Sequence, residues 1–236
     1  MNKFAVATLG ICLGFWVIKS QPAFAAIFPI GINDFSGNET LVRYEEHVFE
    51  VPLTEPVHGQ TFRDVLHQFT VNGQPSLDAD LSSGTGHLVN GLGTPMISGP
   101  ASGVLSLIFP NPQNRLGYGF ATPALGTTVV VPNATTVELF DVNNFSLGTI
   151  SEDASGYQNL YSIPGGFLGV ESTTPFLRAE VSFKEIYNGS RFSFDNLRYE
   201  SVSQAVPEPA TLLGLVSVLG CGVLLKQDYS RKQKKS

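Results

Sequence analysis

The stretch Phe192-Ser193-Phe194-Asp195-Asn196-Leu197-Arg198-Tyr199 alternates aromatic and polar residues over its first four positions. Successive side chains of a β-strand point to opposite faces of the sheet, so this alternation predicts a strand with one face in the core and the other in water. Val181-Ser182-Phe183-Lys184 repeats the pattern. The two stretches together predict a half-buried antiparallel sheet.

Working outward, short segments rich in β-branched and aromatic residues alternate with Gly, Pro, Asn and Asp clusters. This spacing predicts an all-β fold, an antiparallel β-sandwich of the jelly-roll kind. The glycine-rich run Ser82–Gly103 predicts a long connection. The expected strands are Ile27–Phe35, Leu41–Val51, Val65–Val71, Val104–Phe109, Leu116–Phe120, Thr127–Val131, Thr136–Val142, Ser146–Ser151, Phe167–Ser172, Leu177–Lys184 and Phe192–Tyr199.

The N-terminus has the parts of a signal peptide. Lys3 precedes an apolar run, Phe4–Ile18, and Ala23-Phe24-Ala25 forms an A-x-A cleavage site. We therefore expect the Sec translocase to export the chain and signal peptidase to cut between Ala25 and Ala26. The alternative is an uncleaved membrane anchor.

The C-terminus reads as a membrane stop with an accessible peptide before it. Pro207-Glu208-Pro209 favours extended backbone, because proline fixes φ and biases the preceding residue away from helix. The apolar block Leu212–Leu225 and a lysine-rich tail follow, which predicts one transmembrane helix over 209–226 and a cytoplasmic tail. The block is short for a bilayer core of ~30 Å. The alternative is a buried core helix.

Val206-Pro207-Glu208-Pro209, the apolar helix and the basic end resemble the PEP-CTERM sorting signal of Gram-negative bacteria, also labelled an ice-binding-protein C-terminal anchor. The resemblance covers this tail. It implies processing at the Pro-Glu-Pro site by exosortase, a membrane-embedded cysteine protease-transpeptidase. It also implies an inner-membrane-anchored intermediate that is delivered to the cell surface or extracellular matrix.

The chain thus divides into a signal peptide (1–25), one β-sandwich domain (26–203) and an anchor (204–236). The two cysteines, Cys12 and Cys221, lie in the targeting segments, so the exported domain has no disulfide. Between Ala26 and Ala205 there are 7 basic and 18 acidic residues, a net charge of −11. This acidity argues against nucleic acid as a partner, because phosphate contacts need a basic face.

The middle of the chain, from about Asn111 to Tyr199, resembles a β-sandwich domain common in PEP-CTERM proteins. Similar last strands occur in jelly-roll carbohydrate-binding modules, where the acid often helps to hold a structural calcium ion. The residues that carry the resemblance are Thr136-Val137-Glu138-Leu139-Phe140-Asp141, Leu147-Gly148, Gly166-Phe167-Leu168-Gly169-Val170, Phe194-Asp195-Asn196-Leu197 and, near the start, Ile32-Asn33-Asp34-Phe35.

Asp195 is the main candidate for a metal ligand, because an acid within an aromatic strand is costly to bury without a partner. Calcium would satisfy it through carboxylate and backbone oxygens. Asp34 and Glu39 could join it, since first and last strands often neighbour in sandwiches. The alternative is that Asp195 caps a turn or accepts hydrogen bonds from backbone amides.

No catalytic pattern stands out. The four histidines, His47, His58, His67 and His87, lack zinc spacing, and there is no Gly-x-Ser-x-Gly elbow. Two sets of side chains could act on sugars, as catalytic acids or as stacking surfaces, although for each a solvated or packed role is the simpler interpretation. They are the acid pairs Glu45-Glu46, Asp78/Asp80 and Glu152-Asp153, and the tyrosines Tyr118, Tyr157, Tyr161, Tyr187 and Tyr199.

The sequence therefore favours a non-enzymatic, exported surface protein that associates with exopolysaccharide through weak glycan or calcium binding. One alternative is an envelope hydrolase acting on glycans. The other is a purely structural surface protein without a ligand.

Overall fold

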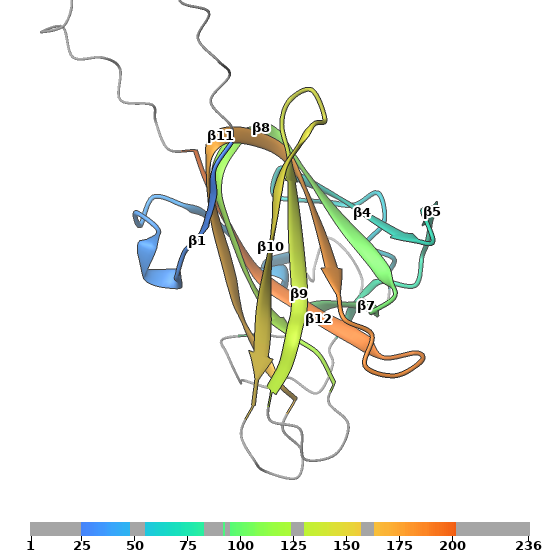
Figure 1. The fold of residues 1–236 in the computed structure, drawn as a ribbon. Helices are drawn as coiled ribbons and strands as arrows, with labels where there is room; N and C mark the ends of the chain where they lie inside the picture. Colours follow the sequence, from blue (N-terminus) through green and yellow to red (C-terminus); the bar gives the residue numbers. More distant parts are fainter. Residues whose placement is uncertain are drawn as a thin grey trace, which may run out of the picture.

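The computed structural model describes residues 25–47, 55–82, 92, 95–123, 130–156 and 163–201, which form an all-β, antiparallel domain consistent with a β-sandwich (Figure 1). The predicted signal peptide up to Phe24 and the predicted anchor from 204 onward lie outside these residues. Within the described part of the chain, no helix is long and apolar enough to span a bilayer. The finer jelly-roll assignment stays a prediction.

The described residues form twelve strands and two short 3₁₀ helices. The strands are β1 (Ile27–Pro29), β2 (Thr40–Val42), β3 (Thr61–Phe62), β4 (Val65–Val71), β5 (Gln74–Pro75), β6 (Asp80–Ser82), β7 (Met96–Pro100), β8 (Gly103–Ala121), β9 (Val130–Phe140), β10 (Ser146–Ser155), β11 (Gly165–Phe183) and β12 (Arg191–Glu200). The 3₁₀ helices are η1 (Ile32–Asp34) and η2 (Tyr44–His47).

The two longest strands, β8 and β11, hold the architecture together. They pair with each other on both sides of a shared interruption, where the register passes from Glu171↔Arg115 through Phe176↔Gln113 to Arg178↔Ile108. Before the interruption β8 also pairs with β4, and after it with β12. Pro110 and Pro112 lie in this part of β8, and their missing N–H groups suit a break in the ladder.

A β-bulge in β12 explains why its alternation lasts only four residues. Asp195 pairs with Gly119 of β8, but the next pair is Arg198 with Gly117, so β12 contains one extra residue. Asn196 adopts a left-handed conformation there, with φ of 52°. The bulge resets the phase of the strand, and Leu197 and Tyr199 return to the buried side.

Aromatic side chains fill the interior. The rings of Phe183 and Phe192 stack with centroids 4.0 Å apart, and Tyr118 lies 4.9 Å from Phe194. Tyr118, Phe192 and Phe194 are completely buried. Such rings bury large apolar areas and favour specific packing geometries. They stabilise a domain whose sequence, from β1 to β12, contains no cysteine and therefore no disulfide.

Several sequence expectations need correction. The expected first strand ends at Pro29 and gives way to η1, and the second is β2 followed by η2, with 48–51 outside the described residues. The supposed loop Ser82–Gly103 contains β7, which pairs with β12 and β6. In three places, two expected strands are parts of one longer strand, namely β8, β9 and β11. The reason is that a bent strand can continue through polar residues that locally resemble a turn.

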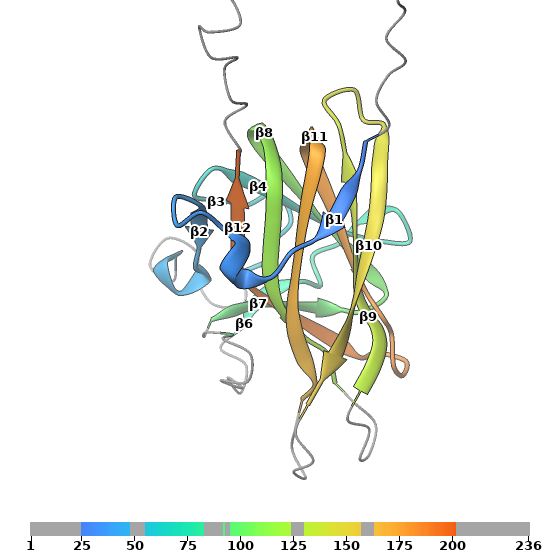
Figure 2. The same ribbon diagram turned by 60° about the vertical axis from the view of Figure 1, so that its left-hand side comes forward.

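Both ends of the described chain lie at one end of the sandwich (Figure 2). Ile27 of β1 pairs with Ser172, next to the interruption in β11. Glu200 of β12 pairs with Arg115, next to the interruption in β8. The hairpin between β9 and β10 projects at the same end (Figure 1). We call this the terminal end of the domain.

Candidate functional site

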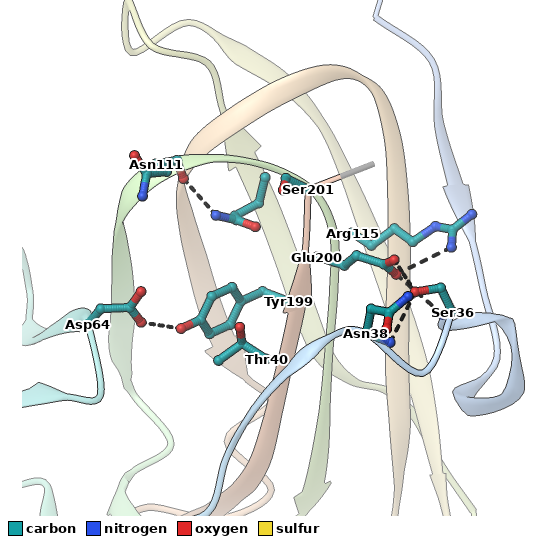
Figure 3. Close-up of a pocket in the computed structure, with 10 residues that line it drawn as sticks. Ser36, Asn38, Thr40, Asp64, Asn111, Arg115, Tyr199, Glu200 and Ser201 are labelled. Carbon is teal, nitrogen blue, oxygen red and sulfur yellow. Dashed lines mark hydrogen bonds and ion pairs between the residues drawn. The ribbon is translucent and has the colours of Figure 1, made fainter. Parts of the chain in front are cut away.

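A polar pocket of about 660 Å³ opens at the terminal end of the domain (Figure 3). Four parts of the chain build it: the stretch before and in β2, the β3–β4 turn, the interrupted part of β8, and the end of β12. The residues that line this polar pocket are Ser36, Asn38, Thr40, Asp64, Asn111, Gln113, Arg115, Tyr199, Glu200 and Ser201.

Tyr199 and Asp64 form one side of the pocket. The bulge in β12 turns Tyr199 inward, where the residue is 3% exposed and its hydroxyl donates a hydrogen bond to Asp64 Oδ1. Burial raises the pKa of the Tyr199 hydroxyl, and the neighbouring Asp64 carboxylate raises it further. Tyr199 therefore stays protonated at physiological pH and acts as a fixed donor.

Arg115 organises the opposite side. Its Nε donates to Glu171 at 3.1 Å, and its Nη1 donates to Glu200 at 3.4 Å and to the carbonyl oxygen of Asp34 at 3.0 Å. Ser36 also donates its hydroxyl to Glu200. The guanidinium thus connects the chain before β2 to β11 and β12.

Amide side chains also line the pocket, and the exposed ones lie at its rim. Asn38 and Asn111 are exposed, while Gln113 is buried and donates from Nε2 to the Asn111 carbonyl at 2.8 Å. A carboxamide carries both donors and acceptors. The polar pocket therefore presents both hydrogen-bond donors and acceptors, which suits a ligand rich in hydroxyl groups.

The structure separates the three acids predicted to share a calcium ion. Asp34 is exposed on η1, and its Oδ2 accepts the Gly31 N–H at 2.6 Å. Glu39 pairs with Arg198 at 2.8 Å. Asp195 is completely buried, with Asn196 Nδ2 donating to it at 3.2 Å.

Asp195 and Asp34 also have different neighbours on β8. Asp195 pairs with Gly119, whereas the backbone carbonyl of Asp34 accepts from the guanidinium of Arg115, a residue four positions from Gly119 or roughly 13 Å along a strand. No set of three or more His, Cys, Asp or Glu side chains in the described ranges is placed to hold a metal. The predicted three-carboxylate cluster is therefore not formed, and calcium binding at Asp195 by other oxygens stays a prediction.

The predicted processing sites fall at the edges of the described chain. Ala26 belongs to the folded domain, because it pairs with Thr173. Its N–H donates to the Thr173 hydroxyl at 3.0 Å, and its carbonyl accepts the Thr173 N–H at 3.0 Å. Ala25 directly precedes it. Pro207, Glu208 and Pro209 lie outside the described residues, so cleavage at both sites stays a prediction.

The other sequence candidates have diverse surroundings. Tyr118 is completely buried and shares a hydrogen bond with Thr135, so it offers no sugar-stacking face. Tyr187 is 43% exposed and lines a second pocket of about 250 Å³. His67 is buried and shares a 2.8 Å hydrogen bond with the Tyr44 hydroxyl. Tyr157 and Tyr161 lie outside the described residues.

Two of the acid pairs lie outside the polar pocket and interact with residues close to them. Asp78 accepts a hydrogen bond from the Ser76 hydroxyl at 2.8 Å, and Asp80 pairs with Arg191 at 3.3 Å. Burial raises the pKa of Glu152, and the adjacent Asp153 raises it further. Neither pair lines the polar pocket.

Sequence reasoning identified Tyr199 but missed the remaining pocket residues. One cue was available, because Asn111-Pro112-Gln113-Asn114-Arg115 is a polar run between two apolar segments that belong to one strand. Asp64, Ser36 and Glu200 had no comparable cue. They converge only because β2 and β4 both reach the terminal end of the domain.

Comparisons with known proteins leave the family open: no family model matches the chain, and no curated protein matches it. Among solved structures it is similar to the Agl-KA catalytic domain, with 14% identity, TM-score 0.34, and coverage of 49% of this chain and 23% of that chain. It is similar to the CBM22-1 xylan-binding domain from Paenibacillus barcinonensis Xyn10C, with 10% identity, TM-score 0.32, and coverage of 63% and 94%.

A third similar structure is the enzymatically active domain of bacteriophage CBA120 tailspike protein 4, with 12% identity, TM-score 0.28, and coverage of 59% of this chain and 20% of that chain. The chain thus spans less than a quarter of the length of two of these three structures. At these TM-scores the three likenesses carry no argument about function.

Proposed function

We propose that this chain is an exported, exosortase-processed envelope protein of a Gram-negative bacterium whose β-sandwich domain binds glycan weakly in the polar pocket. Its role is non-enzymatic: it associates with exopolysaccharide at the cell surface or in the extracellular matrix. The observation that carries the glycan assignment is the polar pocket itself, with its convergent carboxylates, carboxamides and hydroxyls.

The chemistry of the pocket supports a polyhydroxylated ligand. Ligand sites fix orientation with a few well-placed polar groups, and here Tyr199 and Arg115 are held rigid by Asp64, Glu171 and Glu200. Held side chains lose little entropy on binding. The carboxamides at the rim add donors and acceptors that can pair with sugar hydroxyls. An open, polar site of this kind favours weak, exchangeable binding.

The position of the pocket suits a protein that is first tethered and then released. Pro207 follows Ser201 of the polar pocket by six residues, a reach of about 20 Å even when fully extended. Cleavage at Pro207 would leave only this short length of chain beyond the pocket. Cutting there would free the pocket from the membrane side, where a long polysaccharide has little room.

Titration calorimetry of the purified protein with a panel of neutral oligosaccharides tests the glycan assignment. We expect at least one to bind, and Asn111→Ala to weaken that binding about tenfold, because the exposed carboxamide is lost from the rim. Gln74→Ala is the matched control, since Gln74 is exposed on β5 and outside the pocket lining. Absence of binding across the panel would refute the glycan assignment.

An enzymatic role remains the second candidate, because the polar pocket contains two carboxylates, Asp64 and Glu200. Glycosidases use such a pair as acid and base or nucleophile. Both carboxylates here are held by protein donors, Tyr199 for Asp64, and Ser36 and Arg115 for Glu200. Release of reducing ends by the wild type, and its loss in Asp64→Asn and Glu200→Gln, would establish the hydrolase instead.

A further inference from the structure

We propose that the polar pocket selects glycans bearing free amino groups and rejects glycans bearing carboxylates. This inference rests on the proposed glycan binding and specifies the chemical class of the ligand. It follows from how the charges around the pocket are paired.

Arg115, the one cation among the lining residues that the structure describes, already pairs with protein carboxylates. Arg115 pairs with Glu171 at 3.1 Å and Glu200 at 3.4 Å, and its side chain is 21% exposed. Two negative charges thus surround one positive charge. An incoming carboxylate that approaches the guanidinium would meet the negative charges of Glu171 and Glu200 beside it.

Asp64 adds a further negative charge. The residue is exposed, and the hydrogen bond that it accepts comes from the neutral hydroxyl of Tyr199, which does not cancel its charge. The adjacent Arg63 pairs with Glu46 at 3.2 Å, with both side chains nearly half exposed. Arg63 is therefore paired, and the lining residues that the structure describes include two carboxylates, Asp64 and Glu200, against one guanidinium, Arg115.

The residues around the polar pocket add to its negative charge. Arg198, the other cation near this end of β12, pairs with Glu39 at 2.8 Å. The domain as a whole carries 18 acids against 7 basic residues between Ala26 and Ala205. Exposed charges within a Debye length of about 8 Å act together at physiological salt, so an anionic polymer meets repulsion at the pocket and around it.

A sugar ammonium matches what the pocket offers. It is a compact cation with three donors, as in lysine, whereas the pocket supplies acceptors through Asp64, Glu200 and the carboxamide oxygen of Asn111. Exposed ion pairs of this kind contribute up to about 1 kcal/mol, which corresponds to about a fivefold gain in affinity. The selectivity is therefore modest and depends on salt.

Three oligosaccharides of equal length test this inference by calorimetry with the purified protein at low salt: a glucosamine oligomer, its fully N-acetylated counterpart and a uronic-acid oligomer. The amine should bind about fivefold more tightly than the N-acetylated sugar, and the uronic acid more weakly than both. The preference should shrink at 1 M salt, where screening acts within about 3 Å.

Asp64→Asn should remove most of the preference for the amine over the N-acetylated sugar, because it removes the negative charge while the amide oxygen still accepts from Tyr199. Asp78→Asn, an exposed acid outside the pocket lining, should change nothing. Equal affinity for amine and N-acetylated sugar, or a preference that persists in Asp64→Asn, would overturn the charge selection and leave glycan binding intact. No binding by any of the three would overturn both proposals.

Discussion

The hydroxyl of Tyr199 donates a hydrogen bond to the carboxylate of Asp64, which lies 135 positions earlier in the chain. The bond ties the last strand, β12, to the two-residue turn between β3 and β4. Arg63, the first residue of that turn, has a left-handed φ of 55°. One hydrogen bond thus joins a bulged strand and a tight turn at the wall of the polar pocket.

Tyr199→Phe should therefore lower the free energy of unfolding by about 1.5–3 kcal/mol, the usual range for a hydrogen bond to a charged group. Chemical denaturation measures this loss. In a double-mutant cycle with Asp64→Ala, the two losses should be less than additive, because both substitutions remove the same bond. Tyr187→Phe, on an exposed ring, is the control. Strictly additive losses would show that the pair does not couple.

Alkali should unfold the domain. Burial raises the pKa of Tyr44 and Tyr118 well above the ordinary value of 10.0. Because the folded pKa exceeds the unfolded one, the stabilisation is complete below pH 10 and is lost as pH rises above it, by about 1.4 kcal/mol per pH unit for each tyrosine.

Tyrosinate absorbance and circular dichroism should therefore change together in a pH titration above 10. Tyr118→Phe should make the fall in stability less steep by about one proton, since Tyr118 is completely buried. Ionisation of all tyrosines while the native dichroism persists would contradict this account of their burial.

Gly169→Ala should destabilise the domain by about 2 kcal/mol or more. A Cβ at Gly169 would lie 2.4 Å from the Ile30 carbonyl oxygen, and the Ile30 N–H already donates to the Gly169 carbonyl at 2.9 Å. The backbone of β11 and that of the segment after β1 cannot yield as a flexible side chain does, so overpacking strains both. Gly31→Ala is the matched control, because its nearest contact is at 3.4 Å and its φ is −85°. Equal melting temperatures for the two variants would contradict this packing.

Replacing Pro207-Glu208-Pro209 with three alanines should leave export intact and block C-terminal processing. The reason is that the two prolines favour an extended backbone, which a protease can reach. Immunoblots of cell fractions would show an unprocessed, membrane-bound form. The N-terminus should be unaffected, with Ala26 as the first residue by mass spectrometry. Maturation of the variant to wild-type size and location would rule out the sorting assignment.

The calcium expectation predicts that the protein melts several degrees higher in calcium than in EDTA. A ligand that binds the folded state stabilises it by RT ln(1 + [Ca²⁺]/Kd), about 2.7 kcal/mol at a hundredfold excess over Kd. Asp195→Asn should remove most of the difference. Asp34→Asn and Glu39→Gln should preserve the difference in melting temperature. The Asp34 carboxylate accepts a hydrogen bond from Gly31, and Glu39 pairs with Arg198. Identical melting in calcium and EDTA would eliminate the ion site.

Local pattern was informative where side-chain alternation is simple. Val65–Val71 is a strand with the predicted bounds, and the predicted strand at Phe192–Tyr199 lies within β12. The local pattern was misleading at bends, because the polar residues typical of a turn also occur in a bulged or interrupted strand. Asn111–Asn114 looks like a connection, but it lies within β8 and lines the polar pocket with Asn111 and Gln113.

The sequence by itself determined the all-β class, the half-buried character of the sheet and the acidity of the domain, because strand periodicity and net charge are local or additive properties. Only the tertiary structure decided which polar residues meet. Asp195 and Asp34 were expected to lie together, but the structure separates them. Nothing in the sequence linked Asp64 to Tyr199, but the two side chains form a hydrogen bond. The physical reason is strand register. The bulge at Asn196 and the interruptions in β8 and β11 set which side chains converge, and these arise from long-range pairing.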